Sequence, residues 1–108
     1  MNPVLPAPKR EPTPDQHIFH LIRSFPCLAK RARPWLDRAT EFDPDHFHSQ
    51  FARASSSEAL SALFILNVWN DGYARTKGWS FDLRAFMSNA DDGSRAAFLA
   101  WMKNPYWL

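Results

Sequence analysis

The feature that most constrains the fold is an apolar run from Ala59 to Trp69, which only Ser61 and Asn67 interrupt. A helix with apolar side chains on nearly all of its sides has to be covered by several neighbouring elements. The run is also too short to cross a bilayer, which takes about 20 apolar residues. We therefore expect residues 58–70 to form a buried central helix around which the rest of the chain packs.

The rest of the chain favours helices as well. Only three glycines occur in 108 residues, all of them between Gly72 and Gly93, and no segment sustains an alternation of apolar and polar residues. Sheet proteins of this size usually need more turn glycines. The length fits one domain, and 45% hydrophobic residues exclude a generally disordered chain. The sequence predicts an all-α fold, a single small bundle of five to six short helices packed around the central one.

Three residues have the features of helix N-caps: Thr13, Asp43 and Ser55. Each side chain can accept a hydrogen bond from a backbone N–H of the first turn. Thr13 and Asp43 are each followed by a proline, which suits the first helical position. Pro34 lies within the second predicted helix and removes one of its hydrogen bonds, so we expect a kink or two short helices there.

The first twelve residues differ from the rest of the chain. They contain four prolines, and Lys9 and Arg10 lie between them. Proline fixes φ and removes an N–H donor, which is typical of an extended arm. We expect a flexible proline-rich arm over residues 1–12 and a helical domain over residues 13–108. The sequence leaves open whether the arm becomes ordered on binding.

No pattern typical of an enzyme, a metal site or a cofactor site is present. Cys27 is the only cysteine, which excludes an internal disulfide and makes a structural zinc site a poor match. The chain has no glycine-rich phosphate loop, and the serines at 55–57 lack the glycines of a nucleophile elbow. An enzyme would need His17, His20, His46 or Cys27 to converge in one pocket. We expect no enzymatic activity, no metal ion and no cofactor.

Five basic residues lie between positions 23 and 38, and only one acid, Asp37, lies among them: Arg23, Lys30, Arg31, Arg33 and Arg38. The same segment carries apolar residues at helical spacing, so its helix would be amphipathic and basic. Such a helix can contact nucleic-acid phosphates. Against this, three acids follow closely at Glu41, Asp43 and Asp45. Nucleic-acid binding is therefore the alternative function, and a solvated charged face is the simpler interpretation.

Aromatic residues gather in the second part of the chain. Residues 64–108 contain four of the five tryptophans and both tyrosines. Helical spacing assigns most of these rings to the core: Phe64, Trp69, Phe81, Phe86, Phe98 and Trp101. Leu83, Met87 and Met102 belong to the same apolar patterns in the last two predicted helices.

Tyr73 and Trp79 fall outside these patterns. The sequence Asn-Asp-Gly is expected to end the central helix and to begin a loop over residues 70–78. Aromatic residues in loops are often functional contacts, and Arg75 and Lys77 are close to them in sequence. Trp, Tyr and Arg are also the residues that most often dominate binding energy at protein interfaces.

The aromatic segment Tyr106-Trp107-Leu108 is expected to fold back over the central helix, because exposed apolar ends invite aggregation and proteolysis. The alternative is that it projects into solvent and contributes to a contact surface. Its two aromatic residues therefore join the candidate partner-binding residues, which are Tyr73, Arg75, Lys77, Trp79, Tyr106 and Trp107.

These patterns together predict a small helical protein-interaction module: an adaptor, a regulator or an inhibitor that docks on another protein. A single cysteine and the lack of an apolar leader favour the cytoplasm. We expect a bacterial cytoplasm, or delivery into one by a phage or plasmid, and no association with a membrane. The sequence leaves the identity of the partner and the oligomeric state open.

Overall fold

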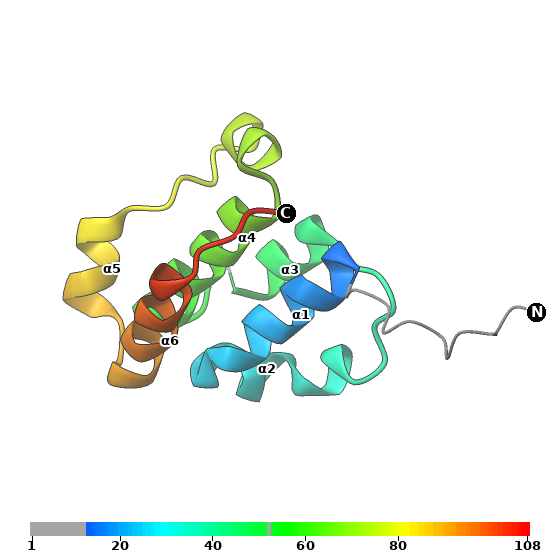
Figure 1. The fold of residues 1–108 in the computed structure, drawn as a ribbon, viewed down its shortest axis with the longest axis horizontal. Coiled ribbons are helices and arrows are strands. Elements are labelled where there is room, and N and C mark those ends of the chain that lie inside the picture. Colours follow the sequence, from blue (N-terminus) through cyan, green and yellow to red (C-terminus); the bar gives the residue numbers. More distant parts are fainter. Residues whose placement is uncertain (1–12, 52) are drawn as a thin grey trace, which may run out of the picture.

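The chain folds into a bundle of helices and contains no strand in the part that the structure describes (Figure 1). The structure is a computed structural model, and it describes residues 13–51 and 53–108. The proline-rich arm predicted for residues 1–12 lies outside the described residues. The predicted all-α fold is confirmed by the helices within them, which are α1 (Pro14–Ser24), α2 (Pro26–Leu36), α3 (Pro44–Phe51), α4 (Ser56–Thr76), α5 (Leu83–Asn89) and α6 (Asp92–Lys103).

Helix α4 lies in the middle of the fold, as the apolar run predicts, and helices α1, α2, α3 and α5 all pack against it. Ser61 and Ile65 in this helix are fully buried. Phe64 joins several elements, because its ring centroid lies 5.0–5.8 Å from rings of the α1–α2 junction, of the α4–α5 linker and of α6: Phe25, Phe81, Phe98 and Trp101. None of the helices within the described residues is both long and apolar enough to cross a membrane.

The predicted N-caps are confirmed. Thr13 accepts a hydrogen bond from the Gln16 N–H and completes a capping box before α1. Asp43 and Ser55 accept in the same way at the starts of α3 and α4. Of the two expectations for Pro34, a division into two short helices is wrong, because α2 runs unbroken to Leu36 with Pro34 inside it. A proline this close to the end of a helix removes only one bond, and the chain leaves the helix soon afterwards.

The backbone of α4 is interrupted at Asn70, which has φ −164° and ψ 97°. Helical turns then resume and continue to Thr76, so the loop predicted over residues 70–78 is wrong for most of its length. The Asn70 side chain explains this, since its Oδ1 accepts a hydrogen bond from the Tyr73 N–H at 2.9 Å and caps the resumed turns. Figure 1 shows the resumed turns at the top of the molecule, bent away from the axis of α4.

The segment after α6 returns to the central helix, as predicted. The Leu108 N–H donates to the Val68 carbonyl oxygen at 3.0 Å, next to the interruption of α4. The Trp101 indole N–H donates to the Tyr106 carbonyl oxygen at 3.2 Å. Between these two anchors Trp107 projects outward and is 68% exposed.

Candidate functional site

Exposed large apolar side chains are confined to one part of the described chain. Each is between 39% and 68% exposed: Leu83, Met87, Leu99, Met102 and Trp107. All lie on α5, on α6 or in the segment after α6, and none of the described residues before position 83 belongs to this group. Folding therefore leaves apolar surface uncovered on the α5–α6 side of the molecule.

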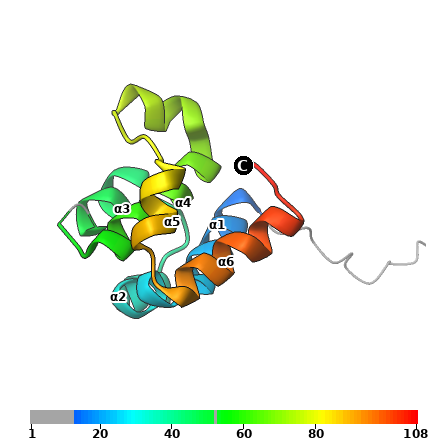
Figure 2. The same cartoon turned by 90° about the vertical axis from the view of Figure 1, so that its left-hand side faces the viewer.

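Aromatic packing holds α5 and α6 together beneath this surface. The ring centroids of Phe86 and Phe98 are 5.2 Å apart, and Phe81 lies 5.5 Å from the first and 6.0 Å from the second. Figure 2 shows both helices on the side of the molecule that faces the viewer. These rings cover the buried part of each helix, and the apolar side chains that remain exposed lie outside this cluster.

Helical spacing aligns the exposed side chains on each helix. Leu83 and Met87 are four residues apart on α5, and Leu99 and Met102 are three apart on α6. Residues at these spacings share one side of a helix. We call these four residues the α5–α6 apolar face.

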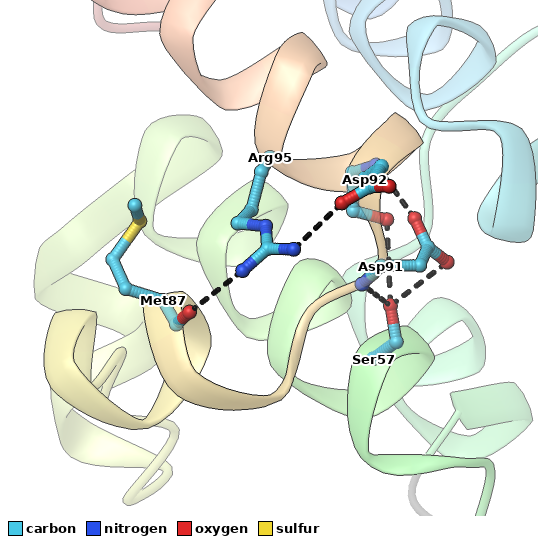
Figure 3. A network of polar contacts seen from close by, with 6 residues as sticks. Ser57, Met87, Asp91, Asp92 and Arg95 are labelled. Carbon is cyan, nitrogen blue, oxygen red and sulfur yellow. Dashed lines mark hydrogen bonds and ion pairs between the residues drawn. The ribbon is translucent and has the colours of Figure 1, made fainter.

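Arg95 links the two helices that form this face. Its guanidinium donates to the Met87 carbonyl oxygen at 3.3 Å and to Asp92 at 2.7 Å (Figure 3). Arg95 precedes Leu99 by one helical turn and lies on the same side of α6. The contact with the end of α5 therefore places Leu99 on the side of α6 that is next to α5.

Asp91 fixes the junction of α5 and α6 to the start of α4. It caps α6 by accepting from the Ser94 N–H at 2.7 Å, and it accepts from the Ser57 hydroxyl at 3.0 Å. The Asp91 N–H donates back to the Ser57 oxygen at 3.0 Å (Figure 3). The hydrogen bonds that its carboxylate accepts, first from the Ser94 N–H and then from the Ser57 hydroxyl, hold the pKa of Asp91 below its ordinary value. The junction beneath the α5–α6 apolar face is therefore hydrogen-bonded to α4 in both directions.

The loop predicted for Tyr73 is wrong, whereas Trp79 does lie in the linker between α4 and α5 but is buried there. Tyr73 lies on the resumed turns of α4, and its hydroxyl donates to Asp45 of α3 at 2.7 Å. Trp79 is only 9% exposed and stacks on His48 of α3, with ring centroids 4.4 Å apart. Contact with α3, which is distant in sequence, explains the burial.

Lys77 completes this contact between α3 and the end of α4. Its ammonium lies 3.2 Å from Asp45 and over the rings of Tyr73 and Trp79, at 5.6 and 5.8 Å from their centroids. The Tyr73 hydroxyl, followed by Lys77, lowers the pKa of Asp45, while the hydrogen bond to Asp45 raises the pKa of Tyr73 and of Lys77. These side chains already have partners within the fold. Arg75 is exposed and pairs with Asp71 at 3.0 Å.

The remaining two candidate partner-binding residues lie together in the returning segment. The ring of Tyr106 is half-buried and lies 5.5 Å from His17 of α1. The ring of Trp107 packs edge-on against Trp101 at 5.1 Å. Trp107 therefore combines high exposure with a supported orientation.

The structure divides the basic stripe predicted over residues 23–38. Arg23, Lys30 and Arg33 line one groove between α1 and α2. Arg31 instead pairs with Glu58 of α4 and lowers the pKa of that carboxyl group. Arg38 donates to the Pro34 carbonyl oxygen at 3.2 Å.

Cys27 and the histidines occupy different surroundings. The Cys27 sulfur lies 3.2 Å from the hydroxyl of the buried Ser94, and the groove beside Cys27 is lined by Lys30, Arg31 and Glu58. His17 contacts Tyr106, and His46 contacts Trp35. Within the described residues, no three His, Cys, Asp or Glu side chains are grouped as they would be to hold a metal ion.

Sequence analysis missed the α5–α6 apolar face. Leu83, Met87 and Met102 belong to the predicted apolar patterns, yet they are exposed. The sequence gives one indication of such a face: the two helices contain more apolar residues than the buried side of each helix can accommodate. Leu99, which is 50% exposed, lies outside the predicted pattern and shows this excess.

Comparison with known proteins assigns no family to the chain. No family model matches it, and neither the curated proteins nor the solved structures contain a significant match. A function therefore has to be inferred from the surfaces described above.

Proposed function

We propose that this protein is a small helical interaction module that docks on another protein through the α5–α6 apolar face. The observation that supports this proposal is the confinement of exposed large apolar side chains to residues 83–107. Single exposed apolar residues are ordinary, but several large ones on two helices that pack together are more than is usual for a folded domain and suit an interaction site. An adaptor, a regulator or an inhibitor could use such a surface.

The chemistry of the face suits docking on an apolar surface of a partner. Two of its four residues, Met87 and Met102, have flexible and polarizable side chains that adapt to irregular apolar surfaces. The helices beneath them are fixed by the Phe86–Phe98 contact and by Asp91, so the side chains adapt while the backbone stays in place. Trp107 offers an additional aromatic anchor of the type that often dominates interface energetics.

A charge placed on this face tests the proposal. Leu99→Asp introduces a carboxylate at an exposed position, so the fold should persist while affinity for a partner falls at least about tenfold. Ala100→Asp is the matched control, because Ala100 is also exposed on α6 but lies roughly 100° around the helix. Trp107→Ala should weaken binding in the same direction.

The measurement begins with quantitative recovery of partners from the native host on immobilised protein. Direct titration of each purified partner with wild type and both variants then gives the affinities. If Leu99→Asp and Ala100→Asp bind a partner equally well, the α5–α6 apolar face is not the docking surface. Trp79→Ala is a poor probe of contact, because the loss of a buried ring would itself destabilise the fold.

Nucleic-acid binding through the basic stripe is the second candidate function. Its support is that Arg23, Lys30 and Arg33 line one groove, although Arg31 and Arg38 are engaged elsewhere. Binding to phosphates should weaken steeply with salt. Tryptophan fluorescence titrated with single- and double-stranded DNA at two salt concentrations tests it. Lack of salt-dependent binding at micromolar protein would exclude this candidate.

A further inference from the structure

The groove between α1 and α2 has the size of a small-ligand site and a mostly charged lining. Its volume is about 430 Å³, within the range of about 300–1,000 Å³ that is usual for such sites. Three cations and one carboxylate line it together with two apolar residues: Arg23, Ala29, Lys30, Arg33, Leu36 and Asp37. The lining therefore offers positive charge, a hydrogen-bond acceptor and an apolar wall.

The charged groups are arranged along the groove. Lys30, Arg33 and Asp37 follow one another at i, i+3 and i+7, so they share one side of α2 and its extension over about 10 Å. Arg23 reaches in from α1, donates to the Leu36 carbonyl oxygen at 3.3 Å and lies 3.7 Å from Asp37. At the Asp37 end of the groove, the charge of Arg23 is therefore balanced by that of Asp37.

The other end is not compensated. No ion pair within the described residues involves Lys30 or Arg33, and both residues are exposed. Like charges at i, i+3 on a helix repel each other, so an anion bound between them would relieve that repulsion. An arginine guanidinium matches the geometry of a phosphate with two parallel hydrogen bonds, and a lysine adds a point charge.

Two features select among phosphate-bearing ligands. Asp37, whose charge Arg23 compensates, adds no net positive charge for a second anion at its end of the groove and can accept hydrogen bonds from hydroxyl groups. The groove lining contains no aromatic side chain on which an unpaired base could stack. The groove is therefore better suited to a small hydroxylated molecule with one phosphate group than to a nucleic-acid strand.

We infer that the groove between α1 and α2 binds a small phosphate ester, with the phosphate between Lys30 and Arg33 and the hydroxyl-bearing part near Asp37. This inference concerns a different group of residues from the α5–α6 apolar face and does not depend on docking there.

Calorimetric titration of the folded protein with inorganic phosphate, ribose, ribose 5-phosphate and AMP tests the inference. The two esters should bind more tightly than inorganic phosphate, and ribose should not bind. Lys30→Gln combined with Arg33→Gln should weaken ester binding at least about tenfold, since hydrogen bonds to charged groups are strong. Arg84→Gln combined with Lys103→Gln makes the same change of charge at exposed positions on α5 and α6 and should leave binding unchanged.

Asp37→Asn separates the two parts of the proposed ligand. The variant removes the negative charge, so inorganic phosphate should bind as well or better, while the preference for ribose 5-phosphate should shrink. No binding of either ester at millimolar concentration, or equal weakening in both double variants, would overturn the inference. Tighter, steeply salt-dependent binding of a short oligothymidylate would replace it with the nucleic-acid hypothesis.

Discussion

The two sides of α4 bury similar rings but present different exteriors. On one side α1 and α3 bury aromatic residues such as Phe19 and Phe47, α2 buries aliphatic residues, and charged groups such as Lys30 and Arg33 are exposed. On the other side α5 and α6 cover it with Phe86 and Phe98 and expose leucine and methionine. Because both sides have a well-packed interior, the apolar exterior of α5 and α6 is not explained by folding. The comparison indicates that the α5–α6 side has exposed apolar surface that a partner could cover.

The largest expected effects test whether both interiors are equally important. Phe47 of α3 is 1% exposed and Phe86 of α5 is fully buried. Each replacement by Ala should lower the free energy of unfolding by about 3–5 kcal/mol, because it removes apolar contacts and leaves a cavity. Urea denaturation followed by tryptophan fluorescence measures both. If Phe86→Ala lowers the free energy of unfolding by less than about 1 kcal/mol while Phe47→Ala has the full effect, α5 is only loosely attached. The two sides of α4 would then not be equally well packed.

A smaller difference is expected between two helix caps. Asp43 caps α3 through the His46 N–H at 3.1 Å, whereas Asp91 caps α6 and also binds Ser57 of α4. Asp43→Ala should cost about 1 kcal/mol, and Asp91→Ala up to about 2 kcal/mol. Thermal denaturation of both variants shows which substitution lowers stability more. Asp91→Asn is the control, because Asn also caps well and should retain most of the stability; equal costs for the two alanine variants would show that the bond to Ser57 adds nothing.

The smallest expected effect depends on pH and belongs to the α3 side alone. Burial against Trp79 lowers the pKa of His48 from its ordinary value of 6.5. Below that pH the unfolded chain takes up a proton that the folded protein resists, so stability falls as the pH drops through this window. His48→Gln should flatten the stability profile between about pH 7 and pH 5.

His20→Gln is the matched control, since His20 is exposed on α1. Asp45 does not interfere, because its pKa lies below its ordinary value of 3.8 and its contribution is lost only in more acidic solution. An unchanged slope in His48→Gln would show that the stacked ring titrates like a solvated one.

Local chemistry made much of the fold predictable. Thr13, Asp43 and Ser55 cap helices because their side chains reach backbone donors within the next turn, and this geometry depends only on nearby residues. The burial of α4 follows equally from its own composition. Features set within a few residues could therefore be derived from the sequence.

The features that the sequence did not predict depend on contacts between residues that are distant in the chain. Asn70 does interrupt α4, but it also caps the turns that follow, so the expected loop is mostly helical. Trp79 is buried because α3 supplies His48, and no spacing in the sequence places those rings together. The exposure of Leu99 likewise depends on how α5 and α6 lie against α4. Candidate surfaces depend on packing between distant segments, and this explains why their residues were assigned less well than the helices.

The interruption at Asn70 has a consequence for motion. Residues 71–76 are joined to the first part of α4 through a non-helical residue, and Asp45 of α3 holds Tyr73 from outside, while His48 stacks on Trp79 just beyond them. Local opening needs the loss of these contacts and the exposure of the buried Ala74, whereas opening of residues 58–68 requires the larger part of the core to separate. The amide hydrogens of this one helix should therefore exchange with solvent in two classes, and the slow class should end close to Val68, where Leu108 donates its hydrogen bond.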